Sequence, residues 1–378
     1  MDPLESEWTN LDMLSDRVVA NSPPGTLARL VDGDKEAMAS LLGVLRMVFP
    51  RNGQLTAEYV EERCRKYAAT GAILEALKLL PVIEQKSEEW HRVRQSIVTA
   101  SDFAQALGEG KFGTQLDFFK KKCGYEDVPF DANCPPLKWG VMLEDVACAI
   151  YERRNNVKVV PFGLVRHPEV AHFGASPDGI TTLGVMLEIK CPYRRQITNE
   201  VPRQYYYQIQ GQLEVCDLDE CDFLECEFRT VGGIAELHGM AGIREVGAIF
   251  EDPYSADSGP GRYLYSPVFE SSAEGLARLA EWIAANAEAI AKVFTKPCLW
   301  YLEKINVIRV YRNREFVAEK FRELESVWSR VVSYRADRDL YDAEIGKKTK
   351  SDLEKSCVVG GGSSKASTGK FVGYMFLD

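Results

Sequence analysis

The sequence predicts an α/β (α+β) fold in which amphipathic helices are combined with short strands. Apolar residues recur at helical spacing in residues 27–49 and again in residues 138–154, which is the pattern of helices with one buried face. Short runs rich in β-branched residues, such as residues 185–189 and 305–313, have instead the composition of buried strands. With 378 residues, the chain is long enough for one large domain or two ordinary ones.

Composition and charge exclude several classes of protein. A hydrophobic fraction of 46% and a charged fraction of 27% are typical of a folded globular chain, which excludes a disordered one. No apolar run is long enough to span a bilayer, and the first ten residues lack the pattern of a signal peptide, so we expect an intracellular protein with no membrane partner. The net charge of −10 argues against a general nucleic-acid coat protein, but it is compatible with an enzyme that binds DNA in a locally basic channel.

The pattern divides the chain into three regions. Residues 1–83 form a helical N-terminal extension, in which Thr56 is a candidate helix N-cap. This extension is either an accessory module for a partner or for DNA, or a helical layer packed on the rest of the protein. Residues 84–340 hold the remaining helices and strands. Residues 341–378 have the composition of a flexible tail, and their apolar C-terminal tip either folds back or docks on a partner.

The strongest chemical signal lies in residues 174–192. Asp178 is part of a Ser-Pro-Asp-Gly turn, and a short apolar strand follows it. Within that strand Glu188 and Lys190 are two residues apart, so both side chains point to the same face. Two carboxylates and one ammonium at one place are costly to bury unless a divalent cation compensates the charge, and oxygen ligands select Mg²⁺ or Mn²⁺.

This stretch resembles the Asp-(x)n-Glu-x-Lys core of the PD-(D/E)xK nuclease superfamily. The resemblance is greatest to the lambda exonuclease and YqaJ-type viral recombinase family, and within it to members from large DNA viruses. Three further blocks occur in the family's order: W-x₃-R-x₆-S in residues 90–101, W-G-x₃-E in residues 139–144 and Q-x-Q in residues 208–210. The resemblance implies a restriction-endonuclease-like core over residues 84–340, with a central mixed sheet flanked by helices.

The resemblance also implies a metal site. Asp178, Glu188 and the backbone carbonyl of Ile189 would ligate a catalytic Mg²⁺, for which Mn²⁺ can substitute. Glu144 would complete the site of a second ion, with Asp145 as the less favoured alternative. The implied cofactor is therefore a pair of divalent ions held by oxygen atoms from a helix, a turn and a strand.

Further site residues follow from the other blocks. Lys190 would act on the attacking water or on the charge that develops at phosphorus. A helix over residues 201–216 carries Gln204, Gln208 and Gln212 at four-residue spacing, and the resemblance assigns to Gln208 the support of the lysine or of a nearby phosphate. Together the implied catalytic residues are Glu144, Asp178, Glu188, Lys190 and Gln208.

A phosphate site is expected at the first block. Ser101 is interpreted as the N-cap of a helix with Arg94 nearby, and a helix N-terminus with an arginine suits an anion. The resemblance assigns Arg94 and Ser101 to the 5′-terminal phosphate of the strand that is cut. The lysines of residues 120–122 and the arginines of residues 309–314 are each either solvated surface or contacts to DNA, and the sequence leaves both alternatives open.

The implied activity is that of a metal-dependent DNA exonuclease, working 5′ to 3′ on double-stranded ends. It would leave 3′ single strands for viral DNA recombination, repair or replication, with a single-strand annealing protein as a partner. The family also implies a ring-shaped homotrimer, and a viral protein would work in the host cytoplasm or nucleus. Two alternatives compete: a structure-specific or nicking endonuclease with the same core, and a non-catalytic scaffold that binds DNA ends. The complete acidic set argues against the scaffold, because such a cluster is costly to keep.

Overall fold

A computed structural model of the chain describes residues 10–50, 52–81, 83, 85, 87–125, 134–252, 263–293 and 297–346. Most of the tail expected over residues 341–378, including its apolar tip, lies outside the described residues. None of the helices in the described ranges is both long and apolar enough to cross a membrane.

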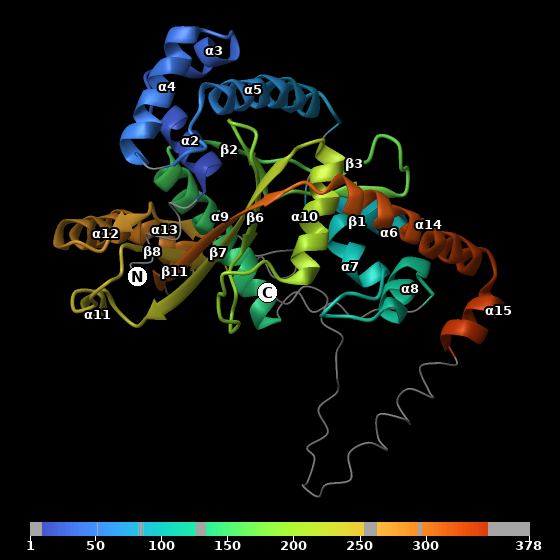
Figure 1. Cartoon of the computed structure of the whole chain (residues 1–378). Coiled ribbons are helices and arrows are strands. Elements are labelled where there is room, and N and C mark those ends of the chain that lie inside the picture. Colours follow the sequence, from blue (N-terminus) through green and yellow to red (C-terminus); the bar gives the residue numbers. More distant parts are fainter. Residues whose placement is uncertain are drawn as a thin grey trace, which may run out of the picture.

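Four helices form the N-terminal part of the structure: α2 (Leu11–Ala20), α3 (Thr26–Val31), α4 (Lys35–Val48) and α5 (Ala57–Lys78). Polar side chains start three of them, because Asn10, Asp34 and Thr56 each accept hydrogen bonds from backbone N–H groups of the first turn. The four helices gather at one end of the molecule (Figure 1). Their apolar faces share one buried cluster with residues of the central sheet, so they pack on the sheet as a layer.

The strands form two mixed sheets. In chain order they are β1 (Val98–Thr99), β2 (Val159–Val160), β3 (Val165–Arg166), β4 (Phe173–Ala175), β5 (Gly179–Thr181), β6 (Met186–Lys190), β7 (Glu220–Val231), β8 (Glu245–Glu251), β9 (Tyr263–Tyr265), β10 (Phe269–Glu270) and β11 (Cys298–Tyr311). The main sheet has the order β10-β8-β11-β7-β6-β5-β2, with β9 paired to β8, and β1-β4-β3 form the smaller sheet. In the main sheet β6 and β7 are parallel, whereas the other pairs are antiparallel.

The remaining helices are α6 (Glu88–Ser96), α7 (Phe103–Ala106), α8 (Gln115–Cys123), α9 (Pro135–Asn155), α10 (Arg203–Cys216), α11 (Ile234–Leu237), α12 (Ala273–Ala285), α13 (Ala287–Val293), α14 (Arg314–Ala336) and α15 (Arg338–Tyr341), followed by a π-helical turn, Asp342–Gly346. Helix α10 is the crossover between the parallel strands β6 and β7, and it covers one face of the sheet. Helix α9 and the N-terminal helices cover the other face. A mixed sheet flanked by helices, with an N-terminal helical extension, is thus confirmed.

Strand β6 shows how the sheet sorts its side chains. Met186 belongs to the buried cluster on the α10 side, while Leu187 and Ile189 belong to the cluster shared with α9 and the N-terminal helices. Because side chains alternate along a strand, Glu188 and Lys190 point to the α10 side together with Met186. The fold therefore places both charged residues of this strand against one helix.

Candidate active site

The Ser-Pro-Asp-Gly turn is tied directly to strand β6. Asp178 precedes β5, and β5 runs antiparallel to β6 with Gly179 opposite Leu187. The Asp178 carboxylate oxygen Oδ2 accepts a hydrogen bond of 2.7 Å from the backbone N–H of Ile189. A Cβ atom at Gly179 would collide with Val159 of the neighbouring strand β2, so glycine is needed next to this aspartate. The turn and the strand therefore bring Asp178 beside the Glu-x-Lys segment, as expected.

Glu188 and Lys190 form a buried pair. Glu188 is completely buried; its Oε1 is paired with the Lys190 ammonium, and its Oε2 accepts a hydrogen bond of 2.8 Å from Gln212 Nε2. Lys190 Nζ also donates to the carbonyl of Ile189 at 3.2 Å and lies 5.2 Å from the centre of the Tyr205 ring. Burial alone would lower the pKa of Lys190, but the carboxylates of Glu188 and Asp178 outweigh it and raise this pKa, so the amine is held in its charged form.

A third carboxylate comes from helix α9. Burial, together with repulsion from Glu188 and Glu144, raises the pKa of Asp178 well above its ordinary value, although Lys190 opposes this. Glu144 lines a pocket at this place. Its neighbour Asp145 is exposed and contacts Tyr265 instead. We call Glu144, Asp178, Glu188 and Lys190 the carboxylate cluster; it carries three acids for one amine.

The donor set of the carboxylate cluster fits a hard divalent cation. Its three acidic side chains offer carboxylate oxygens as donor atoms. A bound Mg²⁺ or Mn²⁺ would neutralise the excess negative charge of the cluster. In the described residues, no group of three or more His, Cys, Asp and Glu side chains is already arranged around one metal position. Glu188 is paired with Lys190 instead. The metal ligands inferred from the sequence thus remain a prediction that the chemistry of the cluster supports.

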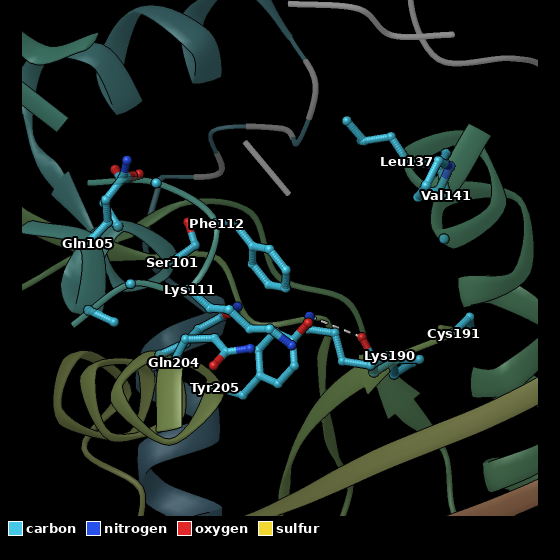
Figure 2. Close-up of a pocket in the computed structure, with 18 of the residues that line it drawn as sticks. Ser101, Gln105, Lys111, Phe112, Leu137, Val141, Lys190, Cys191, Gln204 and Tyr205 are labelled. Carbon is cyan, nitrogen blue, oxygen red and sulfur yellow. Dashed lines mark hydrogen bonds between the residues drawn. The ribbon is translucent and has the colours of Figure 1, made fainter. Parts of the chain in front are cut away.

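One pocket joins most of the residues inferred from the sequence. It lies between the loop after α7, helix α9, the end of β6 and helix α10, and Figure 2 shows Phe112 and Ser101 facing Lys190 and Tyr205 across it. Its cavity volume is about 230 Å³, and the pocket is open to solvent. The inferred residues that line it are Ser101, Glu144, Ile189, Lys190 and Gln208. Asp178 and Glu188 lie behind this wall, held by Ile189 and Lys190.

Two glutamines of α10, Gln208 and Gln212, lie at the site, although only Gln208 was assigned a role from the sequence. Gln208 lines the pocket, although it and Lys190 share no hydrogen bond in the described part of the chain. Gln212 is the one that contacts the carboxylate cluster, through Glu188. The four-residue spacing of the glutamines was the sequence signal that could have found it, because such residues lie on the same helix face.

The expected pair of Arg94 and Ser101 is present, with Arg94 Nη2 donating to Ser101 Oγ at 3.0 Å. The guanidinium lies 4.2 Å from the centre of the Trp90 ring, and Trp90 Nε1 donates to Ser176 Oγ at 3.2 Å, two residues before Asp178. These contacts link the first block of the sequence to the turn of the carboxylate cluster.

The interpretation of Ser101 as a helix N-cap is wrong. The cap is Thr99, which precedes a 3₁₀ turn, Ala100–Asp102. The Asp102 carboxylate accepts hydrogen bonds from the Thr99 hydroxyl at 2.7 Å and from its backbone N–H at 3.3 Å, and these contacts start the turn two residues earlier than expected. Ser101 Oγ instead accepts from Arg94 and lies 2.9 Å from the Thr99 hydroxyl oxygen.

Neither alternative for the lysine run fits Lys121 and Lys122. Lys121 Nζ and Lys122 Nζ each lie 2.7 Å from an oxygen of Asp102, and Lys122 also donates to the carbonyl of Arg94 at 2.6 Å. Lys122 is completely buried, and burial lowers its pKa to about 7. We call Arg94, Asp102, Lys121 and Lys122 the basic cluster, because three basic side chains surround one carboxylate next to the pocket.

The arginine of strand β11, Arg309, lies inside the protein. Arg309 is buried and forms ion pairs with Asp222 at 2.6 Å, Glu220 at 2.6 Å and Asp16 at 3.0 Å. Arg63 of α5 joins the same group through Asp16 and Glu220. The DNA-contact alternative is therefore wrong for Arg309. We call Asp16, Arg63, Glu220, Asp222 and Arg309 the arginine cluster.

Comparison with known proteins supports a viral family. Residues 89–219 match the YqaJ-like viral recombinase domain. Uncharacterized protein R354 of Acanthamoeba polyphaga mimivirus is 26% identical over 332 residues, covering 76% of this chain and 60% of that protein. A protein of African swine fever virus is 28% identical over 161 residues, or 34% of this chain and 46% of that protein. The chain thus spans less than two thirds of the length of these curated relatives.

Among solved structures, the crystal structure of an alkaline exonuclease (LHK-Exo) from Laribacter hongkongensis has a TM-score of 0.39 and 19% identity, with 71% of this chain and 100% of that chain covered. A SOX–DNA complex has a TM-score of 0.28 and 12% identity, with 88% and 92% covered. The family match itself includes the tryptophan–arginine–serine block, the turn and the Glu-x-Lys strand. The resemblance expected from the motifs is therefore confirmed by the match of residues 89–219 to the YqaJ-like viral recombinase domain.

Proposed function

We propose that this protein is a metal-dependent DNA exonuclease that degrades double-stranded DNA from its ends in the 5′-to-3′ direction. The observation that carries the proposal is the carboxylate cluster: Glu144 and Glu188 raise the pKa of a third acid, Asp178, beside one charged lysine. Glu144 and Lys190 line a pocket that Asp102 of the basic cluster also lines. A structural cluster has no need of this excess negative charge, whereas a site for divalent cations requires it.

The residues divide the work as follows in this proposal. Asp178, Glu188 and the carbonyl of Ile189 would hold one Mg²⁺, with Mn²⁺ as a substitute, and Glu144 would hold a second. When bound, the ions supply an activated water and a counter-charge for the leaving oxygen. Lys190 stabilises the negative charge that develops at the phosphoryl group, a role suited to a compact ammonium at the pocket wall.

The basic cluster determines that degradation starts from the 5′ end of a strand. Arg94 and Ser101 bind the 5′-terminal phosphate, and the basic side chains of Lys121 and Lys122 behind them favour an anion at this end of the pocket. Gln208, on the wall between the two ends, positions the strand or Lys190. A strand held by its 5′ phosphate would present its first phosphodiester to the carboxylate cluster.

The relatives indicate the setting in which this activity would be used. They are proteins of large DNA viruses, and the matched domain is named for viral recombinases. We infer that the protein prepares 3′ single strands for viral DNA recombination, repair or replication in the host cytoplasm or nucleus. A single-strand annealing protein as partner, and a ring of three subunits, are part of this proposal.

The proposal is tested by the release of nucleotides from linear duplex DNA in the presence of Mg²⁺. We expect Asp178→Ala to lower the rate by more than about 10³-fold, because it removes a metal ligand. Asp145→Ala changes an exposed acid next to Glu144 that does not line the pocket, so it is the matched control and should retain activity. Equal rates for the wild type and Asp178→Ala would refute the proposal.

A closed circular duplex separates the two alternatives from the exonuclease. An exonuclease leaves this substrate intact, whereas an endonuclease with the same core would nick or linearise it. A non-catalytic scaffold would bind linear ends and release no nucleotides from either substrate. Degradation of the linear form alone is the result that we expect.

A further inference from the structure

We propose that Gln212 is a positioning residue of this site: its amide orients the Glu188 carboxylate and ties it to the turn that carries Asp178. This inference rests on the proposed function, since it concerns how two of the proposed metal ligands are held. It adds to the site a residue that does not line the pocket and that no motif of the family block assigns.

One nitrogen atom makes both connections. Gln212 Nε2 donates to Glu188 Oε2 at 2.8 Å and reaches the carbonyl of Ser176 at 3.4 Å. Ser176 lies in the Ser-Pro-Asp-Gly turn, two residues before Asp178. Helix α10 therefore contacts, through a single amide, the strand that carries one carboxylate and the turn that carries another. The distance between these two elements is fixed by this amide together with the Asp178–Ile189 hydrogen bond.

The surroundings allow only one orientation of the amide. Both neighbours of Nε2 are oxygen atoms that accept hydrogen bonds, so the reverse orientation would set the amide oxygen against a carboxylate and a carbonyl. The amide oxygen Oε1 is buried and has no hydrogen-bond partner among the described residues. The orientation is thus set by the carboxylate, although it leaves a buried oxygen unsatisfied, which a purely structural glutamine would avoid.

A neutral donor is the appropriate partner for a metal-binding carboxylate. The hydrogen bond from Gln212 satisfies one oxygen of Glu188 without neutralising its charge, so the full negative charge stays available to a cation. Lys190, in contrast, neutralises that charge at the other oxygen. Glu188 therefore has one oxygen fixed by the protein and one that can exchange Lys190 for another counter-charge.

The same helix provides a matched control. Gln210 is as deeply buried as Gln212, with exposed fractions of 0% and 1%, and it also makes two hydrogen bonds. Its amide nitrogen donates to the carbonyl of Tyr311 at 2.8 Å and its amide oxygen accepts from the backbone N–H of Asn313 at 2.7 Å. Gln210 supports the end of β11 and does not contact the carboxylate cluster.

The test measures Mn²⁺ binding to the full chain by titration calorimetry without DNA, together with thermal unfolding. We expect Gln212→Met and Gln212→Asn to weaken Mn²⁺ binding roughly 10- to 100-fold, as loss of a hydrogen-bond partner of a metal ligand does. Gln210→Met should lower the melting temperature and leave Mn²⁺ binding unchanged. With linear DNA, the Gln212 variants should lose kcat and keep KM, because Gln212 does not line the pocket.

Each outcome decides a separate point. If the wild type binds Mn²⁺ and the Gln212 variants bind it equally well, the inference fails while the proposed function stands. If Gln210→Met weakens Mn²⁺ binding as much as they do, the effect is general and the inference also fails. A wild type that binds no Mn²⁺ refutes the proposed function itself. Should Gln212→Met not fold, Gln212→Asn decides, since it keeps a polar amide of smaller size but lacks the reach to Glu188.

Discussion

Two groups of wholly or partly buried acids in this protein differ in how their charge is balanced. In the arginine cluster, Asp16, Glu220 and Asp222 meet two buried guanidinium groups, and Lys66 adds a third cation at 3.0 Å from Glu220. In the carboxylate cluster, three acids share one amine. Despite the cost of burial, the arginines lower the pKa of Glu220 to about 2, whereas the pKa of Asp178 is raised. Buried acids alone do not mark a functional site, but an unbalanced group of them does.

The basic cluster is unbalanced in the opposite direction. Asp102 is the one carboxylate among three cationic groups, and burial is outweighed by those cations, so the pKa of Asp102 lies well below its ordinary value. An excess of buried positive charge favours an anion, as an excess of negative charge favours a cation. Glu144 and Lys190 of the carboxylate cluster and Asp102 of the basic cluster line the pocket, whereas no residue of the arginine cluster does.

The largest effect should come from breaking the balanced cluster. Arg309→Met leaves buried carboxylates without their partner, so we expect the free energy of unfolding to fall by about 3–5 kcal/mol, measured by urea denaturation. Nuclease activity per folded molecule should not change. In the absence of divalent ions, Asp178→Asn should instead raise the free energy of unfolding. The substitution removes a carboxylate charge that Glu188 and Glu144 repel, and asparagine has nearly the same shape as aspartate. A loss of stability in both variants would mean that the two clusters do not differ.

The charge balance of the arginine cluster should also appear in how the free energy of unfolding depends on pH. The pKa of Glu220 is lowered from 4.5 to about 2 in the folded protein. Its contribution of about 3 kcal/mol is therefore complete above pH 4.5 and disappears as the pH falls through 2. Wild type and Glu220→Gln should differ in unfolding free energy at pH 7, and the difference should shrink by pH 3. A difference that stays constant across this range would contradict the assignment.

The smallest effect concerns the basic cluster. Removal of the 5′ phosphate from linear DNA should slow digestion roughly tenfold, the equivalent of one charged hydrogen bond. Arg94→Ala should digest both substrates at the same slow rate. Arg314→Ala is the control, because this arginine is exposed and paired with Asp219. A variant at Arg94 that still prefers the phosphorylated end would remove this cluster from the proposed site.

Much of the site could be predicted because its motifs contain their own local geometry. A Ser-Pro-Asp-Gly turn and a Glu-x-Lys strand determine which way Asp178, Glu188 and Lys190 point, and the structure brings them together. The mixed sheet also follows, since α10 is long enough to connect the parallel strands β6 and β7.

The features that could not be predicted depend on contacts between distant parts of the chain. Lys121 and Lys122 look like surface residues until Asp102 of another turn is placed against them. Arg309 meets Asp16 across a separation of 293 residues, which no local pattern reveals. The cap at Thr99 was missed for a different reason: Thr99 and Ser101 are both good caps, and only the position of Asp102 decides between them.

The pairing of β6 with β7 has a practical consequence for dissecting this protein. The matched domain ends at residue 219, and β7 begins at Glu220, so a recombinant fragment cut at the domain limits would lose the strand that borders β6. Strand β6 would then be an edge strand, and its unpaired backbone N–H and C=O groups could pair with another copy of the fragment. An expressible fragment must instead reach from Asp16 to Arg309, so the unit that folds is far larger than the unit by which the family is recognised.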